Sequence, residues 1–261
     1  MSITLGPTFL GIGAQKAGTT WLYKMLRLHP DIGMPVQKEL HFWDDTILNV
    51  ATIEHYMSLF GAMSQKVRGE ITPSYAILPV DRIALIKYHL PELRLIYILR
   101  NPIDRAWSHA KMELAKYVYK KKAQPPEPLS EWFEAHFRSR ESLLRGDYAA
   151  TLENWLSHYP MKNIKTYIYE EDLQAPKKLL ESCCLHIGAD PDFYGTGQEA
   201  IFNTRIYPET TFLGRQPSDL PNELPTVYLD SLISIYKQPI AKISALTGRD
   251  LYSLWLSPYE K

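Results

Sequence analysis

The chain has 261 residues, 45% of them hydrophobic, and its 29 basic side chains balance its 29 acidic ones. This length and composition suit one large α/β domain or two small ones, and they exclude a disordered chain. Zero net charge excludes a protein that binds nucleic acid or membranes through bulk positive charge, so any anion site must be local.

The two cysteines, Cys183 and Cys184, are adjacent in a helical pattern, and we expect both to be reduced thiols because neighbouring cysteines rarely pair. The first residues lack the basic and long apolar regions of a signal peptide. No run approaches about 18 apolar residues, so no membrane span is expected. A cytoplasmic protein is the resulting expectation.

A strand, a glycine-rich turn and a helix are predicted over residues 9–26. Residues 9–12 form a short apolar run, Gly13 and Gly18 bound the turn, and apolar residues at helical spacing follow. Such a turn directs backbone N–H groups and the positive end of a helix dipole at one point, which favours a phosphate. Lys16 adds a positive charge inside the turn.

This turn departs from the nucleotide triphosphate loop, G-x-x-x-x-G-K-[ST]. Gly13 and Gly18 keep its spacing, but Thr19 stands where that loop has lysine, and the lysine has moved to Lys16. Thr19 and Thr20 offer hydroxyls at the helix start. The alternative is a plain strand–helix turn with a solvated lysine, which the coincidence of these residues after a strand disfavours.

Residues 38–44 form a second unusual stretch. It seats Glu39, His41 and Asp44 among three large apolar side chains. Ionisable groups in such surroundings can have shifted pKa values, which suits acid–base chemistry. The alternative is an ordinary half-buried segment whose charges face water, and spacing alone does not decide between the two.

The following stretch predicts a helix over 47–60, a strand over 67–71 and a helix over 78–90. Residues 93–99 then form a nearly continuous apolar run, typical of a central parallel strand that is covered on both faces. This alternation of strands and helices predicts an α/β fold with a central parallel sheet flanked by helices.

Arg100 directly follows this strand, and Asn101 and Pro102 are typical of a helix N-cap and first helical residue. Ligands of open α/β sheets bind beyond the carboxyl ends of strands. Ser108 lies about two helical turns later and can face the same crevice. A nucleotide hydrolase has a Mg²⁺-binding Asp at this place. Arg100 therefore predicts that a guanidinium meets the phosphate charge, with a surface salt bridge as the alternative.

The rest of the chain predicts one more strand and four helices. The long segment 190–225 is rich in Gly, Pro, Asn and Thr, and such irregular segments are usually functional. No metal-ligand cluster is apparent. The predicted helices cover 130–145, 147–159, 176–187 and 227–246, and the strand covers 164–169.

Four stretches resemble one family, the sulfotransferases that use 3′-phosphoadenosine 5′-phosphosulfate (PAPS). Residues 13–20 resemble its 5′-phosphosulfate loop, and residues 98–108 resemble its 3′-phosphate motif. Residues 38–44 resemble the segment with the catalytic glutamate, and residues 204–208 a late loop that reaches the cofactor. The chain is most similar to the branch of heparan sulfate sulfotransferases and their bacterial and cyanobacterial relatives. The resemblance implies a single domain, 1–261, with a P-loop-like three-layer α/β fold.

The resemblance also implies a metal-independent reaction in which the sulfuryl group passes in line from PAPS to an acceptor hydroxyl, leaving 3′,5′-diphosphoadenosine (PAP). Glu39 is then the base, His41 assists it, and Lys16 contacts the phosphosulfate. The implied cofactor-binding residues are Lys16, Ala17, Gly18, Thr19, Thr20, Arg100, Ser108 and Arg205.

Two departures concern the acceptor. Asn203 and Ile71 stand where many glycan-modifying relatives carry lysine, which weakens the case for an acidic polysaccharide. A simpler glycan, a lipid, a small alcohol or a carrier-bound hydroxyacyl chain stays open, whereas nucleic acid is not expected. Two other functions also stay open: a P-loop kinase or nucleotide hydrolase, which would need Mg²⁺, and a catalytically silent nucleotide-binding module.

Overall fold

The computed structural model describes residues 6–45, 50–121, 124–195 and 220–259. The chain divides into two compact units. The first comprises Met1–Leu99 and Glu153–Ile206, and the second comprises Arg100–Leu152 and Tyr207–Lys261. That the whole chain acts as one domain stays a prediction.

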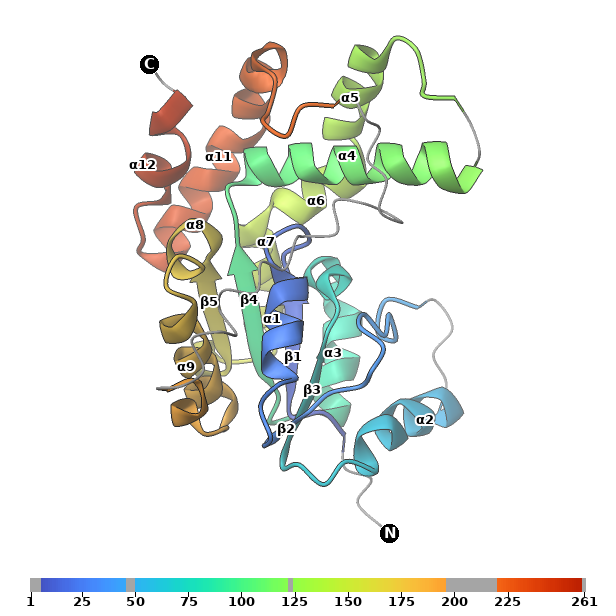
Figure 1. Ribbon diagram of the computed structural model, residues 1–261, viewed down its shortest axis with the longest axis vertical. Helices are drawn as coiled ribbons and strands as arrows, with labels where there is room; N and C mark the ends of the chain where they lie inside the picture. The colour runs from blue at the N-terminus through green and yellow to red at the C-terminus, as the bar shows by residue number, and fades with distance from the viewer. Residues whose placement is uncertain (1–5, 46–49, 122–123, 196–219, 260–261) are drawn as a thin grey trace. The chain divides into compact units, whose positions relative to one another are not determined.

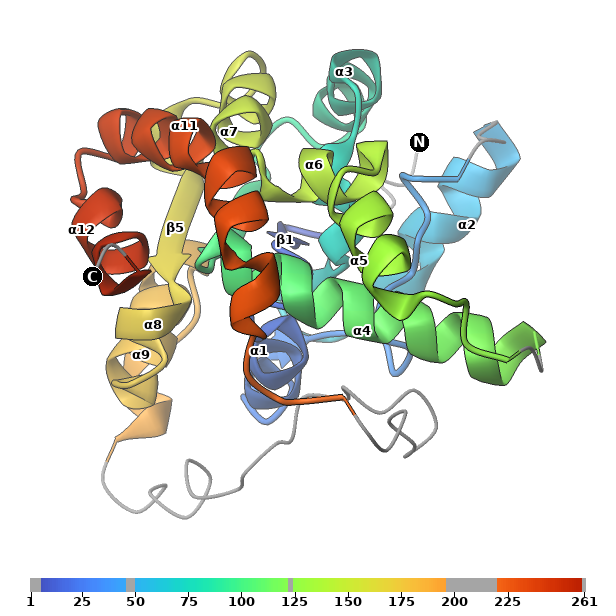
Figure 2. The ribbon, with the colours of Figure 1, turned by 90° about the horizontal axis from the view of Figure 1, so that it is seen from above.

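The first unit is built on a parallel sheet of five strands in the order β2-β3-β1-β4-β5 (Figure 1). The helices α1 (Thr19–Leu26) and α9 (Pro176–Ile187) cover one face, and α3 (Val80–His89) covers the other (Figure 2). This layering confirms the predicted α/β class. The strands are β1 (Phe9–Gly13), β2 (Ile32–Gly33), β3 (Val67–Ile71), β4 (Arg94–Leu99) and β5 (Ile164–Ile168).

The sheet is buried because both of its faces are covered. Every residue of β1 and β3 is buried, and so is every residue of β4 except the first. This explains why β4 reads as a continuous apolar run rather than an alternating one. The chain passes from β1 to β2 and β3 on one side and then to β4 and β5 on the other. The carboxyl end of β1 is therefore the switch point at which such sheets bind ligands.

The second unit is helical in the part of the chain that the structure describes. Its longest helix, α4, contacts α5, α6 and α11. Trp107, Phe133 and Tyr228 pack their rings together in its core. The helices are α4 (Pro102–Lys121), α5 (Leu129–Phe137), α6 (Arg140–Gly146), α11 (Leu229–Thr247) and α12 (Leu251–Trp255), with α7 (Tyr148–Leu156) crossing into the first unit.

Most predicted elements are confirmed within a few residues, including α2 (Val50–Gly61). The predicted helix 130–145 is wrong in one respect: it is two helices, α5 and α6. Ser139 interrupts it because its side chain caps α6 by accepting a hydrogen bond from the Ser142 N–H. The short strand β2 and the one-turn helix α8 (Tyr169–Asp172) were not predicted.

Further predictions can be checked directly. Cys183 and Cys184 are free and buried, as expected, and burial raises the pKa of each thiol to about 12. No helix among the described residues is both long and apolar enough to cross a membrane.

The turn between β1 and α1 is held in an unusual backbone conformation. Gly18, the N-cap of α1, has φ 83°, and Lys16 has φ 71°. Glycine adopts this left-handed region freely, whereas a residue with a Cβ atom pays roughly 1–2 kcal/mol. The turn is tied to the sheet because the Ala14 N–H donates to the Ile98 carbonyl at 2.7 Å. The fold therefore holds Lys16 in a strained position.

Because of this strain, Lys16→Gly should be more stable than Lys16→Ala, by about 1 kcal/mol. The free energy of unfolding of both variants, measured by chemical denaturation, tests this. Lys24 provides the matched control, since it is an exposed residue within α1. There the order should reverse, with Gly less stable than Ala by about 1 kcal/mol. The same order at both positions would contradict the left-handed conformation of Lys16.

Candidate active site

Two predicted segments lie at the same edge of the sheet in the first unit. Strands β1 and β3 pair in parallel, with Gly11 opposite Ile71, so their carboxyl ends are neighbours. Strand β1 itself contacts the 3₁₀ helix Pro73–Ile77 that follows β3. The segment 38–44 reaches the same place, where the Phe42 N–H donates to the Tyr75 hydroxyl at 3.1 Å. This edge therefore carries both the Lys16 turn and the Glu39 segment.

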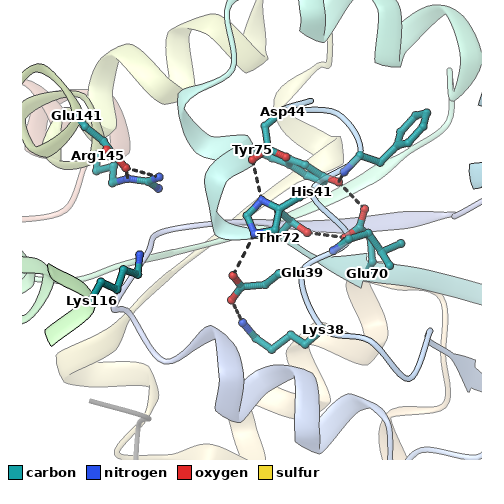
Figure 3. A network of polar contacts seen from close by, with 12 residues as sticks. Lys38, Glu39, His41, Asp44, Glu70, Thr72, Tyr75, Lys116, Glu141 and Arg145 are labelled. Atoms are coloured by element: carbon teal, nitrogen blue, oxygen red, sulfur yellow. Dashed lines mark hydrogen bonds and ion pairs between the residues drawn. The ribbon is translucent and has the colours of Figure 1, made fainter. Parts of the chain in front are cut away.

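Four ionisable side chains contact one another in sequence along the segment 38–44 (Figure 3). Lys38 is ion-paired with Oε1 of Glu39. Oε2 of Glu39 lies 3.6 Å from Nε2 of His41, and Nδ1 of His41 lies 2.7 Å from Oδ2 of Asp44. Because the Asp44 carboxylate accepts a hydrogen bond, Nδ1 of His41 carries a proton. Nε2 is then the ring nitrogen that lies toward Glu39. The side chain of Glu39 is 35% exposed and can reach a substrate.

The residues predicted to be catalytic share a strained backbone. Among the described residues other than glycine, positive φ occurs at Lys16 (71°), Glu39 (61°) and His41 (55°). Each such conformation costs about 1–3 kcal/mol and persists only where the surroundings enforce it, as at active sites and ligand clamps. The surrounding structure thus fixes these three positions at an energetic cost.

A buried carboxylate lies beneath this segment. Glu70, near the end of β3, is 1% exposed and accepts a hydrogen bond from the Tyr56 hydroxyl. It also accepts hydrogen bonds from the hydroxyls of Thr72 and Tyr75 (Figure 3). Burial raises the pKa of Glu70 above its ordinary value, and these hydroxyls counteract part of that rise. The connection of Glu70 to the Glu39 segment was not predicted from the sequence. The only signal was an acidic residue within a buried strand.

Arg100 and Ser108 belong to the second unit. Arg100 directly follows β4, and its carbonyl accepts a hydrogen bond of 2.7 Å from the Tyr148 hydroxyl. The helix that carries Ser108 begins as predicted, because Oδ1 of Asn101 accepts from the Ile103 N–H at 3.0 Å. Ser108 is 7% exposed. The backbone at Arg100 and the start of the Ser108 helix are thus both fixed by hydrogen bonds.

One cation near these residues was not predicted from the sequence. Lys111 lies three residues after Ser108, on the same side of α4. Its Nζ donates to the carbonyls of Pro221 and Asn222, at 3.2 and 3.0 Å. Burial lowers the pKa of Lys111, and the positive charge of Arg100 lowers it further. An anion beside the two cations would relieve this repulsion, and the i+3 spacing from Ser108 was the available signal.

The remaining site residues divide between the units. Ala17 to Thr20 lie in the first unit, where Ala17 and Thr19 are buried and Gly18 and Thr20 half-buried. Arg205 and Asn203 lie outside the described residues. The convergence of both groups on one cofactor therefore stays a prediction. No group of three or more His, Cys, Asp or Glu side chains is placed to hold a metal ion within the described ranges.

Ile71, where many relatives carry lysine, is a core residue here. It is 1% exposed, and its Cγ1 would lie 2.6 Å from a Cβ atom added at Gly11. The side chain of Ile71 therefore fills the space that the missing side chain of Gly11 leaves.

Known proteins with a related sequence include heparan sulfate glucosamine 3-O-sulfotransferase 3B1 of Homo sapiens, 29% identical over 168 residues. That match covers 60% of this chain and 40% of the human protein, so the chain spans about two fifths of its length. Heparan sulfate glucosamine 3-O-sulfotransferase 6 of Mus musculus is 25% identical over 272 residues, which cover 94% of this chain and 72% of that protein.

The fold is similar to the crystal structure of a sulfotransferase from Alicyclobacillus acidocaldarius, with a TM-score of 0.66 and 25% identity. The match covers 95% of this chain and 98% of that one. A family model described as "Sulfotransferase domain" matches residues 7–199. That range includes the glycine-rich turn, the strained segment 38–44 and the Arg100 motif, and the chain therefore belongs to the sulfotransferase family.

Proposed function

We propose that this chain moves a sulfuryl group from PAPS to the hydroxyl of an acceptor, with Glu39 as the base. One observation carries the proposal: the left-handed backbone at Lys16, Glu39 and His41, which lie on segments meeting at the carboxyl edge of the sheet. A fold has no need of three strained residues at one edge for stability alone. Membership of the sulfotransferase family supports the same conclusion.

The donor set suits a cofactor with phosphates at both its 5′ and 3′ positions. The N-cap of α1 is a glycine without a side chain, so the first-turn N–H groups of α1 are not capped by a side chain at that position. Lys16 and these N–H groups would hold the 5′-phosphosulfate. Arg100, Ser108 and Lys111 would hold the 3′-phosphate. When bound, PAPS supplies the sulfuryl group and a phosphate as its leaving group.

The residues of the chain divide the chemistry between them. Oε1 of Glu39 is held by Lys38, so Oε2 is the oxygen that accepts the proton of the acceptor hydroxyl. His41 lies beside Oε2 and is itself oriented by Asp44. Lys16 and the N-terminus of α1 stabilise the negative charge that develops at the phosphate. Metal independence and a cytoplasmic location belong to this proposal.

The acceptor we propose is a hydroxyl on a molecule without dense negative charge. The relatives named above act on heparan sulfate by their names, but position 71 of this chain holds a buried isoleucine and offers no cation to an acidic glycan. A neutral glycan, a lipid, a small alcohol and a carrier-bound hydroxyacyl chain remain. A screen of these classes with PAPS labelled in its sulfuryl group, including a heparan sulfate oligosaccharide, distinguishes them.

PAP should raise the melting temperature of the protein in the presence of a chelator. The reason is that Arg100 occupies the place of a Mg²⁺-binding Asp. At about 100 times its dissociation constant, PAP should stabilise the protein by about 2.7 kcal/mol. Thermal denaturation with PAP and with ATP, each with and without Mg²⁺, checks this. Stabilisation by ATP with Mg²⁺ alone would favour a kinase or hydrolase.

Glu39→Gln should keep the fold and the affinity for PAP but lose most turnover. Glutamine is nearly isosteric and cannot accept the proton, and a positioned base contributes about 10²–10⁴-fold. Sulfuryl transfer at saturating PAPS and calorimetric titration with PAP measure the two effects. Turnover close to that of the parent would assign the base to another residue, with His41 the first to test.

The parent should bind PAP about 10²-fold or more tightly than adenosine 5′-monophosphate, since charged hydrogen bonds contribute roughly 1.5–3 kcal/mol each. Arg100→Ala should shrink this preference, because the guanidinium fork matches a phosphate. Lys16→Ala is the control that removes a cation from the other end of the cofactor and should leave the preference largely intact. Equal binding of the two nucleotides by the parent would mean that the Arg100 motif is misassigned.

A further inference from the structure

The backbone around Glu39 and His41 is held from below by two buried side chains. The Leu40 N–H, between the two strained residues, donates to Oε2 of Glu70 at 3.4 Å. The N–H groups of Phe42 and Trp43 donate to the Tyr75 hydroxyl at 3.1 and 3.4 Å. These three amides flank or closely follow the positions with positive φ. Glu70 and Tyr75 therefore hold the backbone at the place where it adopts the strained conformation.

The hydrogen-bonding capacity of both anchors is filled. Oε1 of Glu70 accepts from Tyr56 at 3.0 Å and from Tyr75 at 2.7 Å, and Oε2 accepts from Thr72 at 2.6 Å as well as from Leu40. A carboxylate offers about four such acceptor positions. Because the Tyr75 hydroxyl donates its hydrogen bond to Glu70, both of its lone pairs can accept hydrogen bonds from the backbone of the segment. Glu70 thus sets the orientation of the hydroxyl that holds two amides.

We propose that Glu70, acting through Tyr75, is a positioning residue that holds the base Glu39 in its reactive place. This role rests on the proposed function, in which Glu39 takes the proton. Burying a carboxylate costs free energy unless hydrogen bonds compensate for its lost hydration, so packing alone does not explain a glutamate at this position. What Glu70 adds, and an apolar residue cannot, is acceptors for the amides beside Glu39.

Tyr56 offers a matched control for Tyr75. Both hydroxyls donate to the same oxygen of Glu70, and both residues are almost completely buried. The Tyr56 ring stacks on Phe42 at 4.3 Å, a contact that phenylalanine preserves. Of the two hydrogen-bonding patterns that the structure describes, that of Tyr75 also includes acceptance from the backbone N–H groups of Phe42 and Trp43. Replacing each tyrosine by phenylalanine therefore removes the same bond to Glu70 and differs in the two amide bonds.

The first measurement is amide hydrogen exchange by NMR, which needs no substrate. Tyr75→Phe should speed the exchange of the Phe42 and Trp43 amides by about tenfold, the effect of losing a hydrogen bond. Glu70→Gln should speed the exchange of the Leu40 amide as well. The N–H₂ group of glutamine is a donor and cannot accept the hydrogen bonds that a carboxylate oxygen of Glu70 accepts. Tyr56→Phe should leave all three close to the parent. Exchange at Phe42 and Trp43 that is equal in the two tyrosine variants would overturn the proposal.

The second measurement is hydrolysis of PAPS, with water as the acceptor. The water oxygen bonds to sulfur, the bond from sulfur to the phosphate oxygen breaks, and Glu39 takes a proton from water, giving sulfate and PAP. At saturating PAPS, Tyr75→Phe should lower the rate about tenfold or more, since a misplacement of about 1 Å can cost about 100-fold. Tyr56→Phe should keep the rate, and both variants should bind PAP like the parent.

A double substitution shows whether Tyr75→Phe lowers the rate through Glu39 or through an unrelated disturbance of the fold. In the Glu39→Gln background, Tyr75→Phe should change the remaining rate by less than about twofold, because residues that act through each other are not additive. A full additional tenfold loss would overturn the role assigned to Glu70. A parent that neither binds PAP nor hydrolyses PAPS would overturn the proposed function and this role with it. The exchange data would then still decide whether Tyr75 anchors the segment.

Discussion

The covered parallel sheet is the constraint on which the rest of the first unit depends. Helices occupy both faces, so the residues of β1 and β3 are buried throughout and cannot meet a substrate. Chemistry is confined to the edge at which the strands end. The polar residues follow this rule: the Lys16 turn leaves β1, and Glu70 and Tyr75 stand at the end of β3 and just beyond it. A carboxylate near the end of a buried strand is unusual. The position of Glu70 beside the carboxyl edge of the sheet explains its presence.

Strain and support are coupled at this edge. Three left-handed residues would relax if the chain around them were free, and the structure opposes this with hydrogen bonds rather than with apolar packing alone. Directional bonds suit the task because they fix the orientation of peptide groups, whereas apolar contacts restrict mainly their position. The arrangement gives up some stability for a fixed geometry, as functional sites commonly do.

Much of this could be predicted from the sequence, for reasons that lie in particular residues. The run over β4 and the glycines around Lys16 determine the strand and turn through local geometry, and Asn101 and Pro102 determine a helix start. The segment around Glu39 was singled out by its charged and apolar neighbours, and the role of Glu39 as base was implied by the family resemblance. The contact between Glu70 and the Glu39 segment could not be predicted, because it joins residues about 30 positions apart through hydrogen bonds that no sequence periodicity encodes. Lys111 was missed because a lysine within a long helix usually faces solvent.

The packing of Ile71 against Gly11 bears on how this enzyme can acquire a new acceptor. A lysine at position 71 would have to place its ammonium in a space that is closed by β1 and 1% exposed, where an unpaired charge is costly. A lysine at this one position therefore cannot supply a cationic contact to an acidic glycan. The backbone of β1 and β3 would have to separate at the same time. Positions 11 and 71 are thus coupled: a cation at this place in the sheet would require changes in two strands together.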